Sequence, residues 1–122
     1  MSEIRRLSAE DLDRFACIAA NAYPRFGWHD SDKRESLLQR LRAMHEEDPS
    51  VRFVGLFRGG KLLGGMRLHD FCMNLFGAMT SAGGVGMVAV DLLHKKQHIA
   101  KELLEHFLRT YRAQGAPLAL LY

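Results

Sequence analysis

The chain has 122 residues, of which 48% are hydrophobic and 25% are charged, and its net charge is +3. This length allows one domain with a small core, and the composition is that of an ordinary globular protein. The net charge is too weakly basic to predict nucleic-acid binding by itself. No run approaches the roughly 18 apolar residues of a membrane span, and the first residues lack the apolar segment of a signal peptide. We therefore expect a cytoplasmic protein that contacts neither membrane nor nucleic acid.

The N-terminal third predicts a short strand followed by two helices. Ile4 and Leu7 mark the strand, and Ser8 with Asp11 is typical of a helix N-terminus. Apolar residues then recur at helical spacing until Pro24 ends the first helix; they are Leu12, Phe15, Ala16, Ala19 and Tyr23. A second helix begins at Ser31 or Asp32, with Glu35 placed to complete a capping box on Asp32. It presents Leu37, Leu38, Leu41 and Met44, and the segment 48–50 ends it.

The middle of the chain predicts antiparallel strands. Residues 51–57 and 61–69 form two strands, and Gly59–Gly60 between them suits a tight hairpin turn. Residues 71–80 continue as a strand or an irregular edge whose register the pattern does not fix. The next strand runs from Gly83 to Val90, and its three glycines favour a bulge or the close approach of a ligand.

The last third predicts a strand, a basic turn, a helix and a final strand. The helix starts near Lys96, and Gly115 and Pro117 end it. Its apolar residues recur at helical spacing; they are Ile99, Leu103, Leu104, Phe107, Leu108 and Tyr111. The apolar run 118–122 predicts a buried strand parallel to the preceding one. No further strand follows in the chain to pair with the outer edge of this strand, so we expect the edge to be available for pairing with a second copy.

The basic turn before the last helix is the first candidate binding feature. Lys95 and Lys96 precede the free N–H groups at the helix N-terminus, an arrangement that suits a diphosphate. Basic turns that enter helices are also common on ordinary surfaces, so the pattern alone leaves both interpretations open. The glycine-rich strand just before the turn favours the ligand.

The strand-to-helix segment resembles a motif of the GNAT acyltransferase superfamily and, within it, of the Eis-like (enhanced intracellular survival) acetyltransferases. Val88-Ala89-Val90, followed by residues 94–101, matches the family pattern Val-x-Val, a short turn, then Arg/Gln-x-x-Gly-x-Ala/Gly. Lys95 falls on the Arg/Gln position, His98 on the glycine and Ala100 on the small residue. The glycine run 83–86 and the C-terminal segment 115–122 also resemble the Eis-like pattern, so the similarity extends over essentially the whole chain.

The resemblance implies an α/β fold with a mixed sheet, the GNAT-like acyl-CoA N-acyltransferase fold, over residues 1–122. It implies acetyl-CoA as co-substrate and a primary amine of a small molecule or a lysine as acceptor. The implied acetyl-CoA-binding residues are Val88, Ala89, Val90, Lys95, Lys96, Gln97, His98, Ile99, Ala100 and Lys101. The aromatic residues of the loop 23–30, namely Tyr23, Phe26 and Trp28, would bind the acceptor; rings in such a loop also serve to cap a core.

The chain departs from the Eis-like pattern in several respects, among them lysine at the arginine positions and Leu92 where many members have proline. His98 replaces a glycine beside the diphosphate, where its side chain either crowds the ligand or adds a hydrogen bond. Eis-like proteins also continue beyond the last strand, and the family's general acid and C-terminal carboxylate belong to those later parts. We therefore expect a partial, truncated domain with little or no turnover by itself and leave its catalytic residues unassigned. The alternative is a non-catalytic module for CoA binding or oligomerisation.

Other reactive residues have simpler interpretations. Cys17 and Cys72 stand in no motif, which favours buried free thiols. His94 and His98 have i, i+4 spacing, but a metal site would need a third ligand, and we predict none. Asp91 suits a helix N-terminus better than a general base.

Overall fold

The computed structural model of the protein describes residues 2–23, 29–94, 98–115 and 118–121. Its elements follow one another in an α/β order: β1 (Ser2–Arg6), α1 (Asp11–Ala22), α2 (Ser31–Glu47), β2 (Val51–Arg58), β3 (Lys61–Leu75), β4 (Ala78–Val90), η2 (Leu92–His94), α3 (Ile99–Ala113) and β5 (Leu118–Leu121). The strands form one five-stranded sheet in the order β1-β2-β3-β4-β5. The pairs from β1 to β4 are antiparallel, and β5 is parallel to β4. The predicted mixed α/β sheet is confirmed.

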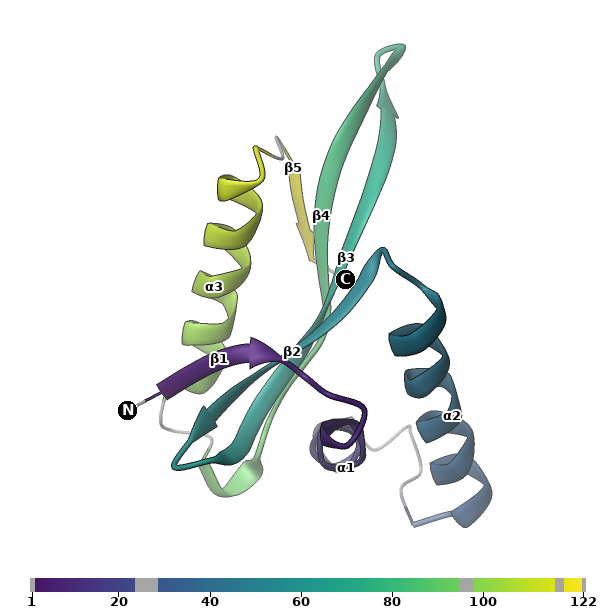
Figure 1. Cartoon of the computed structure of the whole chain (residues 1–122), viewed down its shortest axis with the longest axis vertical. Coiled ribbons are helices and arrows are strands. Elements are labelled where there is room, and N and C mark those ends of the chain that lie inside the picture. The colour runs from purple at the N-terminus through teal and green to yellow at the C-terminus, as the bar shows by residue number, and fades with distance from the viewer. Residues whose placement is uncertain (1, 24–28, 95–97, 116–117, 122) are drawn as a thin grey trace.

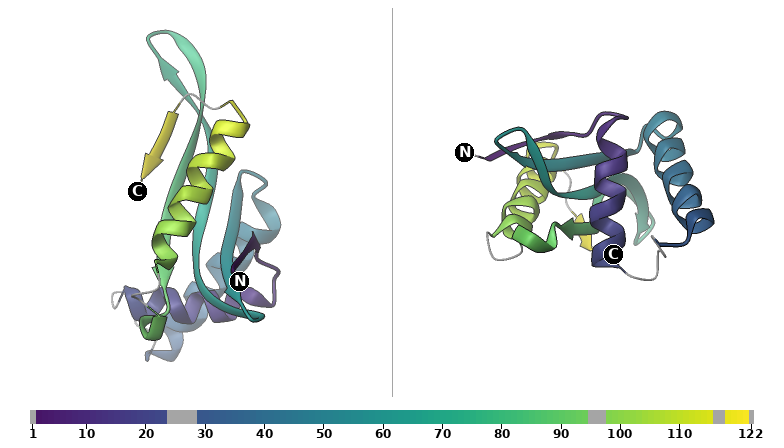
Figure 2. Two further views of the ribbon diagram at one scale, coloured as in Figure 1. Left: turned by 90° about the vertical axis from the view of Figure 1, so that its left-hand side faces the viewer. Right: turned by 90° about the horizontal axis from the view of Figure 1, so that it is seen from below.

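Helices cover both faces of the sheet (Figures 1 and 2). On one face α1 and α2 pack against the sheet through buried residues such as Phe15, Leu41 and Phe53. On the opposite face α3 packs through Ile99, Leu103 and Phe107, which reach the sheet beside Met66 and Leu68. The stripe predicted for α1 is buried from Leu12 to Ala19, and Tyr23 is half-buried. The stripe predicted for α3 is buried except for Leu104, which is half-buried, and Leu108, which is exposed.

Asp30 caps α2, which begins at Ser31, one of the two predicted starting residues. Its Oδ1 atom accepts the backbone N–H groups of Asp32, at 3.0 Å, and of Lys33, at 3.3 Å. The predicted capping box on Asp32 with Glu35 is wrong, because Asp32 already lies inside α2. Asp30 instead has the extended backbone that a capping residue needs (φ −89°, ψ 115°).

Two tight hairpins connect β2, β3 and β4. Gly59 and Gly60 have φ values of +59° and +78°, which confirms the predicted turn. The second hairpin turns at Phe76 and Gly77, whose φ values are +52° and +85°. The sequence did not predict this turn: residues 71–80 are two strands separated by it.

Gly83 lies under the ring of Tyr111, which explains one of the glycines in β4. A Cβ atom at Gly83 would stand 2.3 Å from the ring carbons of Tyr111, closer than real Cβ contacts allow. The predicted bulge at these glycines is wrong for Gly83, which pairs regularly with Asp70 on β3 and Ala119 on β5. The irregularity in β4 lies further along, at Met87.

Adding a methyl group at Gly83 should destabilise the fold. We expect Gly83→Ala to lower the free energy of unfolding by about 1–3 kcal/mol, because the ring of Tyr111 has to move away from the sheet. Urea denaturation measures the effect. Gly59→Asn is the matched control: no atom lies within 4 Å of a Cβ there, and asparagine tolerates a positive φ. Equal stability of the Gly83→Ala and Gly59→Asn variants would contradict this packing.

Candidate functional site

A bulge interrupts β4 near its C-terminal end. Gly65 pairs with Ala89 and Arg67 pairs with Gly86, so Met66 alone opposes the two residues Met87 and Val88. Met87 has a φ of +52°, which a side chain rarely adopts. Such a bulge bends a strand and changes the direction of its main-chain groups.

After Val85, β4 keeps β3 as a paired strand but no longer pairs with β5. β5 pairs only with residues from Ala82 to Val85, so residues 86–90 have no strand there in the part of the chain that the structure describes. Asp91 donates its N–H to the carbonyl of Leu63 on β3 at 2.8 Å, and the carbonyl of Ala89 also faces β3. Because main-chain groups alternate sides along a strand, those of Val88 and Val90 face the open side.

Tyr23 occupies part of this open edge. Its hydroxyl donates to the carbonyl oxygen of Val88 at 2.9 Å. The contact brings the end of α1, where the predicted acceptor loop begins, against the strand of the family motif. The main chain of Val90 also faces the open side, but Tyr23 does not contact it through this hydrogen bond. Ala89 instead pairs with β3 and buries its side chain.

The N-terminus of α3 follows the open edge. His98 precedes the helix with φ +59° and ψ +26°, and its side chain makes no capping hydrogen bond. The first hydrogen bond within the helix is donated by the Glu102 N–H to the His98 carbonyl at 3.1 Å. The N–H groups of residues 99–101 come before it and therefore have no partner within the helix. Ile99 buries its side chain, while His98, Ala100 and Lys101 are exposed.

Asp91 fixes the turn between β4 and α3. Its carboxylate forms an ion pair with Arg14 of α1 and accepts the N–H of Leu93 at 3.0 Å. The side chain is only 11% exposed. These contacts tie the end of β4 to α1 and give Asp91 the structural role that the sequence favoured, here at η2 rather than at α3.

Several predicted site residues lie outside the described residues. They are Lys95, Lys96 and Gln97 of the basic turn, and Phe26 and Trp28 of the acceptor loop. The structure brings the others together: Tyr23 contacts Val88, and Val90 leads through Asp91 and η2 towards His98.

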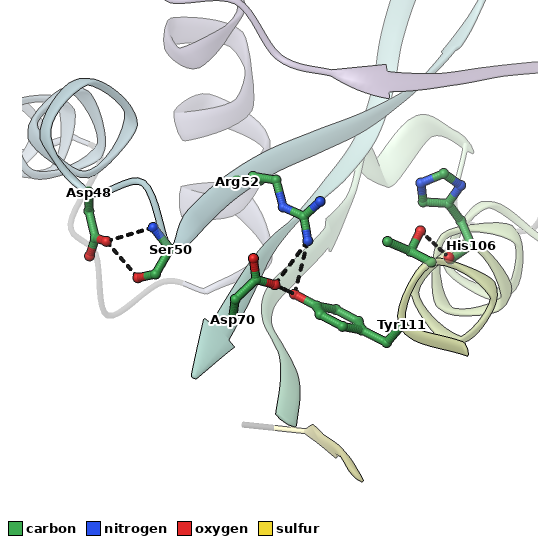
Figure 3. A network of polar contacts seen from close by, with 7 residues as sticks. Asp48, Ser50, Arg52, Asp70, His106 and Tyr111 are labelled. Carbon is green, nitrogen blue, oxygen red and sulfur yellow. Dashed lines mark hydrogen bonds and ion pairs between the residues drawn. The ribbon is translucent and has the colours of Figure 1, made fainter. Parts of the chain in front are cut away.

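A second polar cluster, which the sequence did not indicate, lies between β2, β3 and α3 (Figure 3). Asp70 Oδ1 accepts from the Tyr111 hydroxyl at 2.5 Å and from Arg52 Nη2 at 3.0 Å. Burial, and the hydrogen bond donated to Asp70, raise the pKa of Tyr111 to about 12, although Arg52 opposes the rise. Tyr111 was predicted only as part of an apolar stripe, and its partners are 41 and 59 residues away in the sequence.

A shallow cavity of about 280 Å³ lies beside this cluster. Its walls come from the C-terminal part of β3, the N-terminal part of β4 and the C-terminal end of α3. They include Asp70, Cys72, Tyr111 and Gln114. Cys72 is exposed and Cys17 is partly buried, and both are free thiols. The prediction that both cysteines are buried is therefore wrong for Cys72, which lies on the part of β3 that extends past the covering helices.

Metal and membrane features are absent from the part of the chain that the structure describes. Within residues 2–23, 29–94, 98–115 and 118–121, no three His, Cys, Asp or Glu side chains are grouped to hold a metal ion. Among the same residues, no helix combines the length and apolar character needed to cross a bilayer.

The sequence profile described as "Acetyltransferase (GNAT) domain" matches residues 3–122. The chain belongs to the GNAT acetyltransferase family. A search of curated proteins found no match. Members of the GNAT family generally transfer an acetyl group from acetyl-CoA to an amine, so acetyl-CoA and an amine acceptor are the ligands that they share.

Solved structures of GNAT-like proteins have the same fold. A transcriptional regulator from Bacillus halodurans C-125 matches with a TM-score of 0.79 and 14% identity, over 100% of this chain and 81% of the other. A ribosomal-protein-alanine N-acetyltransferase from Brucella melitensis biovar Abortus 2308 matches with a TM-score of 0.75 and 20% identity, over 100% and 79%. A probable N-acyltransferase from Enterococcus faecalis V583 matches with a TM-score of 0.76 and 15% identity, over 98% of this chain and 29% of that one. At these identities the likeness shows the fold alone.

Replacing His98 by glycine should stabilise the protein. A side chain in the left-handed region costs roughly 1–2 kcal/mol, which glycine avoids at a smaller entropic cost. We expect His98→Gly to raise the free energy of unfolding by up to ~1 kcal/mol, measured by urea denaturation. His98→Ala keeps the Cβ atom and should give no such gain; if alanine stabilised as much as glycine, backbone strain at this position would be refuted.

Comparison of the parent protein with Tyr111→Phe, which lacks the hydroxyl, should reveal how Tyr111 makes the free energy of unfolding depend on pH. The folded pKa of about 12 lies above the ordinary value of 10.0, so the protonated phenol stabilises the fold fully below pH 10, and this contribution is lost as the pH rises through 12. We expect Tyr111→Phe to be less stable than the parent by about 1 kcal/mol at pH 8. Urea midpoints of both proteins between pH 8 and 12 should converge at the alkaline end. A difference that stayed constant across this range would contradict the raised pKa.

Proposed function

We propose that this protein is an acetyl-CoA-dependent N-acetyltransferase of the Eis-like type, which transfers acetyl to a primary amine of a small molecule or a lysine. The observation that carries the proposal is the edge of β4 beyond Val85, which has no second paired strand among the described residues and precedes η2 and the N-terminus of α3. An extended ligand with amide groups pairs with such an edge, and an anionic end fits a helix N-terminus. Acetyl-CoA has both features in one molecule.

The described residues fit this ligand in two places. The main chain of Val90 would pair with the pantetheine arm, next to the Val88 carbonyl that already accepts from Tyr23. The N–H groups of residues 99–101 would bind the diphosphate, assisted by the ammonium groups of Lys95, Lys96 and Lys101. Gln97, which lies outside the described residues, and Ala100, in the first turn of α3, complete the proposed cofactor-binding set. His98 is exposed beside it, so its imidazole would border the diphosphate.

Bound acetyl-CoA supplies an acetyl group already activated as a thioester. The task left to the chain is to orient a neutral amine towards that group and to accept one proton. Tyr23 is placed for orientation, because its hydroxyl is bonded to the strand that would hold the cofactor. Phe26 and Trp28 would line the same acceptor site. Asp91 is engaged by Arg14 and by the N–H of Leu93, so we do not assign it as the base.

The Eis-like assignment is supported by the motif from Val88 to Lys101 and by the occurrence of this fold within a much longer probable N-acyltransferase, of which the match covers 29%. We propose that residues 1–122 form one partial GNAT domain that acts in the cytoplasm. Little turnover is expected of a partial domain on its own. A module that binds CoA without catalysis is the second candidate, favoured by His98 at the glycine position of the motif.

Calorimetric titration with CoA and with pantetheine, which lacks the diphosphate, tests the site. We expect both ligands to bind, and we expect Lys95→Ala/Lys96→Ala to weaken CoA binding at least tenfold without changing pantetheine binding. Arg109→Ala/Arg112→Ala removes the same charge from the exposed far end of α3 and serves as the control. Failure of CoA to bind, or an equal effect of the two double variants, would contradict the proposal.

Thiol release from acetyl-CoA then separates the two candidate functions. An aminosugar and a lysine-containing peptide serve as acceptors. Release that depends on the acceptor supports the N-acetyltransferase, even if it is slow. Binding of CoA with no release above the acceptor-free rate supports the non-catalytic module instead.

A further inference from the structure

The hairpin formed by the end of β3 and the beginning of β4 extends past the rest of the sheet (Figure 1). β2 pairs with β3 only as far as His69, and one further bond joins the Asp70 N–H to the Ser50 carbonyl at 2.8 Å. On the other side β5 begins to pair with β4 at Ala82. Among the described residues, therefore, both outer edges of this projecting hairpin, residues 71–81, have no paired strand.

The projecting hairpin is apolar and carries no charge. Phe76 at its tip is 100% exposed and Met79 is 72% exposed. Residues 71–90 contain no Asp, Glu, Lys, Arg or His, although a quarter of the whole chain is charged and twenty residues would carry about five charges on average. Proteins usually protect an open strand edge with charges or proline, and this edge has neither. Phe76 alone exposes roughly 150–250 Å², which is about half of the roughly 300–600 Å² of the largest apolar patch on a typical monomer.

Phe76 also occupies a backbone position that disfavours it. Its φ of +52° belongs to a turn in which asparagine followed by glycine is preferred. A bulky side chain there costs conformational energy, and full exposure means that Phe76 gains no packing within its own chain. A residue that breaks a local preference without a gain inside the molecule points to a gain outside it.

We propose that a second copy of this chain pairs with the projecting hairpin along the outer edge of β3, so that two sheets join antiparallel about a two-fold axis. Two identical uncharged edges meet without repulsion, whereas elsewhere the net charge of +3 opposes association. A two-fold pairing uses the same patch on both copies, so one apolar hairpin is enough to form it.

The register centred on Met73 uses the exposed aromatic side chain best. It sets Asn74 opposite Cys72 of the second copy, and the ladder ends there, because the Asp70 N–H is already bonded to the Ser50 carbonyl. Residues that oppose each other in an antiparallel pair share a face of the sheet, so Phe76 of the second copy would lie on the face of Cys72 and Asp70, beside the shallow cavity that these two residues line. The contact is smaller than the roughly 1,200–2,000 Å² of standard interfaces, so we expect a weak dimer with a Kd in the micromolar range.

Sedimentation equilibrium of the 122-residue chain and of Phe76→Asn tests the proposal. Asparagine suits the turn, so the variant should keep or raise the melting temperature while its dimer Kd rises at least tenfold. Met79→Lys, which places a charge on the hairpin, should weaken the dimer similarly. Leu108→Gln is the control, since Leu108 is 51% exposed on α3, and it should leave the Kd unchanged.

Two results would overturn the proposal. A parent chain that stays monomeric at several hundred micromolar has no such dimer. A dimer that Phe76→Asn and Met79→Lys leave intact forms through another surface. Both results are independent of CoA binding, so the proposed enzymatic function stands or falls separately.

Disulfide cross-linking tests the register. Under mild oxidation, Asn74→Cys should yield a covalent dimer, because the new thiol lies opposite the exposed Cys72 of the second copy. Asn74→Cys/Cys72→Ser is the control and should stay largely unlinked. Equal cross-linking of these two variants would overturn the Met73-centred register and with it the predicted contact of Phe76.

Discussion

The structure depends on a change of hydrogen-bonding partners along β4. Up to Val85 this strand has β3 on one side and β5 on the other. The bulge at Met87 then shifts the register against β3, and the next three residues keep only that one neighbour. Strand edges inside a sheet normally leave no main-chain groups free. Among the residues that the structure describes, the end of β4 has an unpaired edge that precedes the N-terminus of α3, and this combination suits an extended ligand with an anionic end.

The packing around β4 holds that edge in place. Arg14 of α1 pairs with Asp91 at the end of the strand, and Tyr23 at the end of α1 bonds to Val88 within it. On the other face, α3 packs closely against the sheet, where Ile99 lies so near Gly64 that a Cβ atom there would stand 2.8 Å from its Cγ2. The helix on one face thus holds Val88 and Asp91, and the helix on the other packs against Gly64, which pairs with Val90. Such rigidity is what a site that works by positioning requires.

Much of this arrangement follows from sequence patterns, and the remainder has identifiable physical causes. The apolar stripes of α1 and α3 and the Gly59–Gly60 turn are encoded locally, so they were predictable. The turn at Phe76 was missed because phenylalanine is not a turn residue, and the bulge was assigned to the glycines because nothing marks Met87 for a positive φ. Arg52, Asp70 and Tyr111 meet only after the strands and α3 have packed, and the exposure of Cys72 depends on how far β3 extends. The assignment of residues 88–90 and 95–101 to the cofactor, in contrast, came from the resemblance of the motif and stays a prediction.

Amide hydrogen exchange with and without acetyl-CoA tests the central claim most directly. Along the end of β4, the N–H groups of Ala89 and Asp91 face β3 and should exchange slowly in both states, whereas that of Val90 faces the open side. The account predicts that acetyl-CoA slows exchange at Val90 and at residues 99–101, and leaves residues 71–76 unchanged. If Val90 were already protected without the ligand, or gained no protection with it, the open edge would not be the cofactor site.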